Sequence, residues 1–274
     1  MSSEAPGYIE TPAGSLFRML HRPAGAVRAA VLLVPPCADE KRAAHNSLTR
    51  IARELCSSGA AVLRFDPFGT GDSAGESADF SASTLRRDAA AARRELNRLV
   101  PDAPLVIVGF RLGASAALLD AEASGAARVA AVAPIVKGAS WLRQQRGRRR
   151  LRRSMVRREM AAMGAEAAAA AEAELPEGVV EDLDGLPLSA DFVREIEKLD
   201  LTSASRPEGA AGPRALIVQV SPRKTPLPEL ERAAAAFAAE ICCLQLEPFW
   251  QPLEAPDVAP LAARLRDFLP GGEA

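Results

Sequence analysis

Short runs of apolar residues alternate along the chain with longer, alanine-rich stretches of helical periodicity. Regular alternation of strand-like and helix-like segments predicts a largely parallel sheet with helices on both of its faces. The first two strands, Tyr8–Thr11 and Leu16–His21, flank Gly14 and predict an antiparallel hairpin instead. Six further strands are expected at Ala29–Val34, Ala61–Asp66, Leu105–Val108, Val129–Val136, Ala215–Val220 and Ile241–Leu246.

Helices are expected between these strands. A helix over Ala44–Cys56 should stop at Gly59, because glycine suits the position just after a helix. The strand Leu105–Val108 is purely apolar, which is typical of a central strand covered on both faces. The other helical stretches are Thr84–Leu99, Leu112–Ser124, Leu227–Ala239 and Val258–Leu269.

The alternation fails between about Gly138 and Ser205 and then resumes. We interpret residues 139–205 as a helical cap inserted into one α/β domain, whose core is formed by residues 1–138 and 206–274. At 274 residues, the chain is long enough to bury a large core beneath such a cap.

The cap segment contains Arg143–Arg158, which is dense in arginine and free of acidic residues, followed by the alanine-glutamate tract Ala165–Glu174. A solvated face is one interpretation, because arginine stems cover apolar surface while their charged heads reach water. An acidic protein partner or a membrane surface is the alternative; no nucleic acid is expected, since the net charge of −1 gives no overall attraction to polyanions. An apolar stripe predicts that this helix lies on the core, through Trp141, Leu142, Leu151, Met155, Met160 and Met163.

Composition excludes several kinds of protein and of site. No basic-then-apolar leader opens the chain, and no apolar run approaches the roughly 20 residues of a membrane-spanning helix, so a cytoplasmic location is expected. Neither a metal nor another cofactor is expected, because the cysteines lack the spacing of a zinc site. These four cysteines are Cys37, Cys56, Cys242 and Cys243.

Three segments resemble the α/β-hydrolase superfamily. Pro35–Glu40 follows a strand where family members place an oxyanion-hole loop, and Asp66–Ser73 is similar to the family's D-x-x-G-x-G-x-S stretch. Val108–Gly113 has the strand–turn–helix setting of the nucleophile elbow. More narrowly, the chain resembles the serine-aminopeptidase-like proteins known as exosortase A system-associated hydrolases, particularly their second type.

This resemblance implies the α/β-hydrolase fold, a mostly parallel sheet with helices on both faces and an inserted helical cap. It also implies a bacterial hydrolase with a Ser-His-acid triad. The exosortase linkage would imply a role around the export of polysaccharide or sorted surface proteins.

The three triad positions, however, hold other residues. Arg111 stands between Gly109 and Gly113, where the serine belongs, and arginine cannot lose its proton near neutral pH. The acid belongs within Ser221–Lys224, which contains no carboxylate, and the histidine within Glu247–Pro252, which contains no histidine. Without a triad, only about 10³–10⁴-fold rate enhancement remains, which is too little for an ordinary esterase or peptidase.

Cys37 is another candidate nucleophile. It lies beside the expected pocket, and His45 is the one partner in sequence that could serve it as a base; a packed thiol is the alternative. Ser115, one helical turn beyond Arg111, is interpreted as a packing residue, and His21 as a structural one.

Arg111 is expected at the carboxyl edge of the sheet and at a helix N-terminus, where open α/β folds bind ligands and where anions are favoured. Two interpretations follow: a small anionic ligand binds the guanidinium, or Arg111 plugs the pocket by pairing with Asp39, Glu40 or Asp66. The residues expected to line a ligand site are Cys37, Ala38, Asp39, Arg111, Leu112, Trp250 and Gln251.

Asp66, at the end of a strand, is either a ligand contact or the cap of the turn through Gly69 and Gly71. Three functional hypotheses remain at this point. The chain is a non-catalytic pseudohydrolase that binds a small ligand or a partner, a hydrolase of unorthodox chemistry that uses Cys37 or a recruited water, or an interaction protein that acts through its basic cap. The sequence does not indicate an oligomeric state.

Overall fold

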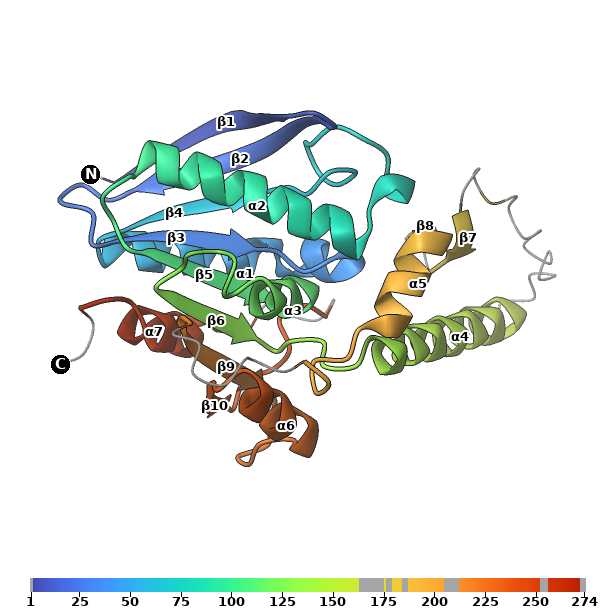
Figure 1. The fold of residues 1–274 in the computed structure, drawn as a ribbon. Coiled ribbons are helices and arrows are strands. Elements are labelled where there is room, and N and C mark those ends of the chain that lie inside the picture. The colour runs from blue at the N-terminus through green and yellow to red at the C-terminus, as the bar shows by residue number, and fades with distance from the viewer. Residues whose placement is uncertain are drawn as a thin grey trace.

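Eight strands form the main sheet. They are β1 (Ser3–Thr11), β2 (Gly14–Arg22), β3 (Ala29–Val34), β4 (Ala60–Phe65), β5 (Leu105–Phe110), β6 (Arg128–Val132), β9 (Arg214–Val220) and β10 (Glu240–Leu244). In the computed structural model, which describes residues 2–162, 175, 179–183, 187–204, 212–251 and 256–271, their order is β1-β2-β4-β3-β5-β6-β9-β10 (Figure 1). β1 and β2 form an antiparallel hairpin, β2 also runs antiparallel to β4, and the other neighbouring pairs are parallel.

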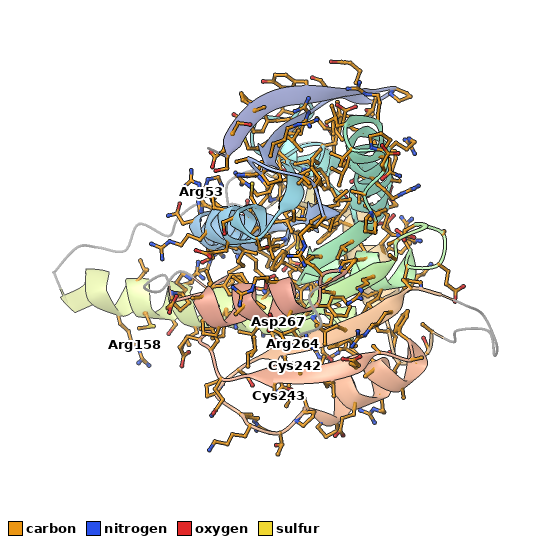
Figure 2. All side chains as sticks on the ribbon, turned by 90° about the vertical axis from the view of Figure 1, so that its left-hand side faces the viewer. Arg53, Arg158, Cys242, Cys243, Arg264 and Asp267 are labelled. Carbon is orange, nitrogen blue, oxygen red and sulfur yellow. The ribbon has the colours of Figure 1, made fainter. Side chains whose placement is uncertain are left out.

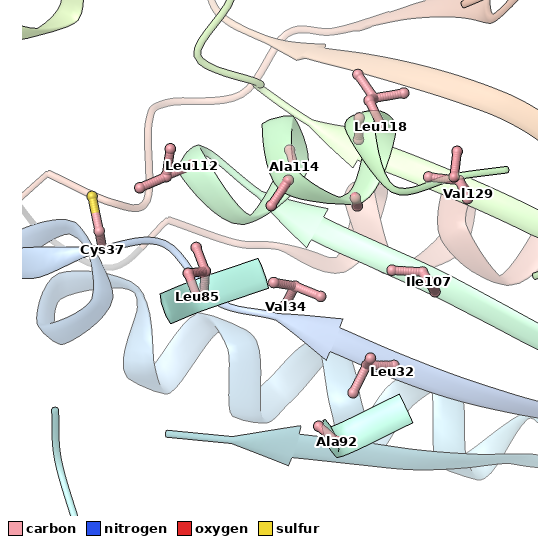
Figure 3. Packing of buried hydrophobic residues seen from close by; sticks show 14 of the residues in the cluster. Leu32, Val34, Cys37, Leu85, Ala92, Ile107, Leu112, Ala114, Leu118 and Val129 are labelled. Carbon is pink, nitrogen blue, oxygen red and sulfur yellow. The ribbon is translucent and has the colours of Figure 1, made fainter. Parts of the chain in front are cut away.

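Helices cover both faces of this sheet. They are α1 (Ala38–Ser57), α2 (Ala82–Leu99), α3 (Leu112–Leu119), α6 (Pro228–Ala236) and α7 (Ala259–Asp267), with a short 3₁₀ turn, η1 (Ser77–Asp79). Side chains of β3 alternate between two buried clusters: Val31 and Leu33 pack with α1 and α7, whereas Leu32 and Val34 pack with α2 and α3. Figure 3 shows the second cluster, with Leu85 of α2 next to the β3 side chains. The predicted fold class, a mostly parallel sheet covered on both faces, is confirmed.

Some boundaries differ from those expected. α1 begins at Ala38 rather than Ala44, because the intervening segment consists of helix formers and its acidic residues favour a helix N-terminus. β6 ends at Val132, earlier than expected, because Ala133 has a left-handed backbone (φ 46°) and Pro134 has no N–H to donate to the sheet.

The segment between β6 and β9 leaves the sheet and is only partly helical. Its elements are α4 (Gly138–Ala162), β7 (Val179–Asp182), β8 (Pro187–Ser189) and α5 (Ala190–Lys198). β7 and β8 pair antiparallel, so the expected helical cap also contains a small sheet. Trp141 of α4 packs edge-on against Phe192 of α5, and both are buried.

The predicted apolar stripe of α4 is wrong beyond its first turns. Trp141 and Leu142 are buried, but Leu151 is 64% exposed and Met155 54% exposed. The helix contacts the rest of the protein near its N-terminal end and then extends away from the sheet, so later apolar positions have no core to face (Figures 1 and 2). The side chain of Met160, and Met163 together with 165–174, lie outside the described residues.

Candidate functional site

Arg111 occupies the sharp turn between β5 and α3. It is the N-cap residue of α3, with φ 55° and ψ −115°, a conformation that non-glycine residues rarely adopt. Gly109 and Gly113 allow this turn. A Cβ at Gly109 would overlap the Gly113 backbone, and one at Gly113 would overlap the carbonyl oxygens of Val34 and Pro35. The geometry is therefore that of the nucleophile elbow, with arginine at its apex.

This backbone conformation costs on the order of 1–3 kcal/mol and persists only where the surroundings hold it. The backbone N–H of Arg111 donates to Val132 O at 3.0 Å, and the Arg111 carbonyl accepts from the N–H groups of Ala114 and Ser115, both at 3.1 Å. Ser115 is fully buried, and its hydroxyl donates to Ile135 O at 2.9 Å. Ser115 thus supports the elbow.

The Arg111 side chain forms a two-pronged ion pair with Glu40 in the first turn of α1. Nε of Arg111 donates to Glu40 Oε2 at 3.1 Å and Nη2 to Oε1 at 3.2 Å. The two side chains are 16% and 7% exposed, respectively. A third donor, Nη1, reaches Ala133 O at 2.9 Å. Glu40, not Asp39 or Asp66, is therefore the carboxylate that neutralises Arg111.

Both tryptophans of the chain contact this ion pair. The Trp250 ring lies 4.8 Å from Cζ of Arg111, a cation–π contact, and Trp141 Nε1 donates to Glu40 Oε1 at 3.2 Å. Gln145, one turn further along α4, donates to the same oxygen at 3.4 Å. Elements from four parts of the chain thus enclose the two charges. The Glu40 carboxylate accepts hydrogen bonds from Arg111, Trp141 and Gln145.

Cys37 is buried as the N-cap residue of α1, next to this cluster. Burial raises the pKa of its thiol well above the usual range, and the Glu40 carboxylate raises the pKa further, although Arg111 opposes the shift. His45 is exposed on α1. Since a thiolate is the reactive form of cysteine, these surroundings do not favour Cys37 as a nucleophile.

A cavity of about 620 Å³ opens between the start of α1 and the loop after β4, with several charged side chains in its wall. Lys41 Nζ lies 2.6 Å from Asp66 Oδ1, and Arg42 Nη2 lies 3.0 Å from Asp39 Oδ1. Asp66 also accepts the backbone N–H of Asp72 at 3.1 Å. The sequence-predicted residues in its wall are Ala38, Asp39, Asp66, Gly69 and Gly71.

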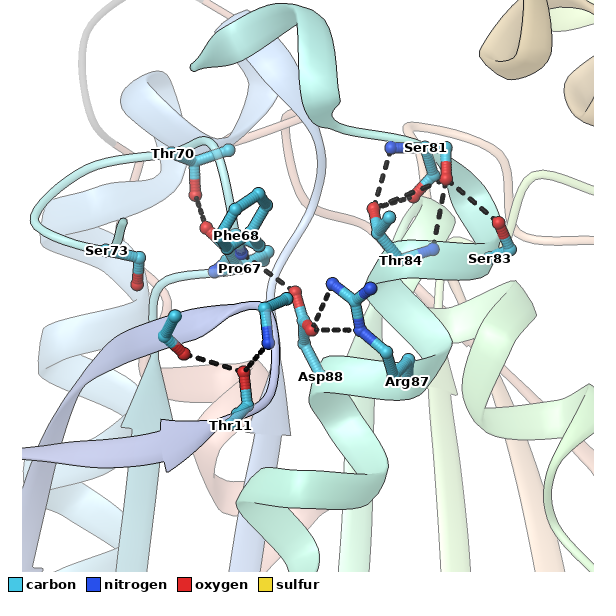
Figure 4. A network of polar contacts seen from close by, with 12 residues as sticks. Thr11, Pro67, Phe68, Thr70, Ser73, Ser81, Ser83, Thr84, Arg87 and Asp88 are labelled. Carbon is cyan, nitrogen blue, oxygen red and sulfur yellow. Dashed lines mark hydrogen bonds and ion pairs between the residues drawn. The ribbon is translucent and has the colours of Figure 1, made fainter. Parts of the chain in front are cut away.

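The loop after β4 is held by a polar network on α2 (Figure 4). The backbone N–H of Phe68 donates to Asp88 Oδ2 at 2.8 Å, and Arg87 donates to Asp88 Oδ1 at 3.1 Å. Ser81 caps α2 by accepting from the Thr84 N–H at 3.0 Å. Sequence reasoning missed Asp88, because an aspartate within an alanine-rich helix carries no sign of a distant partner.

The predicted site residues therefore fall into two groups. Arg111, Leu112, Cys37 and Trp250 are buried or nearly buried around the ion pair, whereas Ala38 and Asp39 face the cavity. Gln251 is partly exposed, and its backbone N–H donates to Pro248 O at 3.2 Å. Sequence reasoning also missed Trp141 and Gln145 as partners of Glu40, although their i, i+4 spacing places them on one helix face.

Two further searches concern the described part of the chain. Among those residues, no group of three histidine, cysteine, aspartate or glutamate side chains is placed to hold a metal ion. No helix in the same residues has the length and apolar character needed to cross a membrane.

No family model matches the chain, and no curated protein matches it in sequence. Solved structures do match. Est1E from Butyrivibrio proteoclasticus, with ferulic acid bound, gives a TM-score of 0.64 at 16% identity, over 96% of this chain and 97% of that one. An esterase from Pyrococcus furiosus gives 0.61 at 12% identity, over 97% and 88% of the two chains. An α/β serine hydrolase homologue from Coxiella burnetii gives 0.57 at 16% identity, over 98% and 97%. Together with the sheet order and the elbow, these matches show that the chain has the α/β-hydrolase fold.

Proposed function

We propose that this protein is a non-catalytic pseudohydrolase, in which an ion pair takes the place of the nucleophile and which acts by binding rather than by hydrolysis. The observation that carries the proposal is the position of Arg111 at the elbow, with its guanidinium held by Glu40. A guanidinium stays protonated at any physiological pH and cannot attack a carbonyl carbon.

The remaining residues support the same proposal. The chain has only two histidines; His21 is buried on β2 with its imidazole between Glu4 and Arg64, and His45 is exposed on α1. Neither neighbours the elbow in sequence. The segment directly after β9, Ser221–Lys224, carries no carboxylate. A Ser-His-acid relay therefore has no evident members, and the raised pKa of Cys37 argues against a thiol substitute.

The ligand site that we propose is the 620 Å³ cavity rather than Arg111 itself. Arg111 already donates three hydrogen bonds, two of them to Glu40, so an anion would have to displace a buried carboxylate. The cavity has both cationic and anionic side chains in its wall, including Lys41 and Asp66. A wall with charges of both signs suits a small polar ligand that carries an anionic group. The narrower proposal, an exosortase-associated role, would be tested by the genes that neighbour this one.

The catalytic part of the proposal is tested with a fluorophosphonate probe and a panel of p-nitrophenyl esters, with a serine esterase as positive control. We expect no labelling and no hydrolysis above buffer, either in the wild type or in Arg111→Ser, because the variant regains a hydroxyl but no histidine. Probe labelling of the wild type, or ester turnover by it, would refute the proposal. Turnover by Arg111→Ser alone would show that a hidden base survives, and the claim of a missing relay would be wrong.

The binding part is tested by thermal melts with phosphate, acetate and citrate. We expect an anion that binds the cavity to raise the melting temperature of the wild type but not of Lys41→Gln. Arg22→Gln, which changes an arginine outside the cavity, is the control. An equal rise in all three proteins would place the anion elsewhere.

A further inference from the structure

The outer half of α4 is an exposed basic segment. We call residues Arg148–Arg158 the basic arm; it contains no acidic residue. Among its described side chains, Arg148, Arg153 and Arg158 are exposed and have no carboxylate partner. Figure 2 shows Arg158 on the part of α4 that projects beyond the sheet. A helix of this length extends about 15 Å, at 1.5 Å per residue.

Exposed apolar side chains gather in the same arm. Leu151, Met155 and Val156 are 64%, 54% and 50% exposed, and they are three of the seven large apolar side chains exposed among the described residues. Scattered exposed apolar residues need no explanation, but Leu151 and Met155 lie one helical turn apart and form one exposed apolar surface.

Along one face of this helix, arginine side chains flank apolar side chains. Leu151 and Met155, at i and i+4, share one face, and the next positions along that face are Arg148 and Arg158. Long arginine stems allow their charged heads to bind anions beside an inserted apolar side chain.

The inner end of α4 is fixed. The indole N–H of Trp141 donates a hydrogen bond to Glu40 Oε1, and Arg146 Nη2 lies 2.8 Å from Glu181 Oε2. The basic arm therefore extends from an anchored base, away from the α/β core (Figure 1). Such an arm can meet an extended surface without disturbing the core.

We propose that the basic arm docks this protein on an anionic lipid bilayer, with Arg148 and Arg158 on the headgroup phosphates and Leu151 and Met155 in the interfacial layer. A helix that binds a protein groove presents a continuous apolar stripe, which Arg148 and Arg158 interrupt here. A nucleic acid would use the arginines but leave the exposed apolar side chains unexplained. A bilayer surface accounts for both features. This inference goes beyond the proposed function, which concerns the elbow and its cavity.

The test is co-sedimentation of the full chain with vesicles of phosphatidylcholine alone, or with 30% phosphatidylglycerol, in 50 mM salt. We expect association with the anionic vesicles only, weakened at 300 mM salt. Each arginine near such a surface contributes about fivefold in affinity, so Arg148→Gln and Arg158→Gln together, on the face of Leu151 and Met155, should weaken binding about 25-fold. The matched control removes the same charge from two other exposed arginines, Arg50→Gln and Arg94→Gln, and should change binding less than fivefold.

A second variant separates insertion from charge attraction. Leu151→Ser with Met155→Ser keeps every arginine and should weaken binding at least tenfold, because it removes the apolar contribution. Circular dichroism of each variant checks that the fold is kept.

Three results would overturn the proposal. These are equal binding to neutral and anionic vesicles, equal loss in the arm and control variants, and no vesicle binding at all. If polyuridylate RNA or polyglutamate binds under the same conditions while vesicles do not, the arm instead serves a nucleic acid or an acidic protein.

Discussion

Arg111 and Glu40 lie 71 residues apart in sequence and meet in a two-pronged ion pair at the carboxyl edge of the sheet. The pair joins the turn after β5 to the first turn of α1, and both charges are largely removed from water. Because a buried charge is tolerated only with its partner, each of these side chains depends on the other. The ion pair thus ties the turn between β5 and α3 to the start of α1.

We expect Arg111→Ala to lower the free energy of unfolding by about 3–5 kcal/mol, because it leaves Glu40 as an unpaired buried charge. Urea unfolding followed by tryptophan fluorescence measures this, since both tryptophans contact the pair. Replacing both charges, Arg111→Met with Glu40→Leu, should recover most of the loss. The control Arg94→Ala, at an exposed position, should stay within about 0.5 kcal/mol. A loss below about 1 kcal/mol for Arg111→Ala would show that water, rather than the ion pair, stabilises these two charges in the wild type.

The sequence predicts the elbow and limits the partner of Arg111 to Asp39, Glu40 or Asp66, but it does not choose among these three. Gly109 and Gly113 bracket Arg111 locally, so pattern alone locates the turn. The choice of Glu40 over Asp39 depends on α1 beginning at Ala38, which sets the direction of each side chain in the first turn. That start was missed because the family resemblance places Pro35–Glu40 in a loop, although the residues from Ala38 onward are helix formers.

The error at Leu151 and Met155 has a different physical origin. Helical periodicity shows which residues share a face, but it does not show where the neighbouring surface ends. Among the described residues, the surface beside α4 buries Trp141 and pairs with Arg146, but it does not extend to Leu151 and Met155, which stay exposed.

Both elbow glycines should resist substitution. Gly109→Ala and Gly113→Ala each place a Cβ against backbone atoms that cannot move, and we expect each to cost at least about 2 kcal/mol. Gly147→Ala, in α4 with open space around it, should instead add up to about 1 kcal/mol through helix propensity. Chemical denaturation ranks the three variants. A Gly113→Ala protein as stable as the wild type would show that the elbow can open.

His21 should make stability depend on pH. Its pKa is lowered to about 4, mainly by burial and also by the charge of Arg64, while Glu4 opposes the shift. In the unfolded chain the pKa is about 6.5, so between pH 7 and pH 5 the unfolded state binds more protons and stability falls as the pH falls. The expected loss from this residue is about 2 kcal/mol over that range. His21→Gln should remove that part of the slope, measured as unfolding free energies at both pH values. An unchanged slope in the variant would contradict a neutral, buried His21.

Cys37 should be unreactive in the folded protein. It is buried and its thiol pKa is raised, whereas Cys242 on the edge strand β10 is partly exposed (Figure 2). With iodoacetamide at pH 8, peptide mapping should find Cys242 alkylated at least tenfold faster than Cys37, because alkylation requires an accessible thiolate. In 6 M urea the difference should disappear. Rapid native alkylation of Cys37 would instead support the thiol-nucleophile hypothesis.

Trp141 should be coupled energetically to the ion pair, because its indole N–H donates to Glu40. Trp141→Phe keeps an aromatic ring beside Phe192 but removes the donor, and hydrogen bonds to charged groups contribute about 1.5–3 kcal/mol. We expect a loss of about that size in the wild type. In the Arg111→Met, Glu40→Leu background, the same change should cost at least about 1 kcal/mol less, since no carboxylate remains to be satisfied. The difference between the two losses is a double-mutant coupling energy, in which the smaller volume of phenylalanine cancels. If both losses are equal, Trp141 acts through packing alone, and α4 is not tied to the elbow by the Glu40 carboxylate.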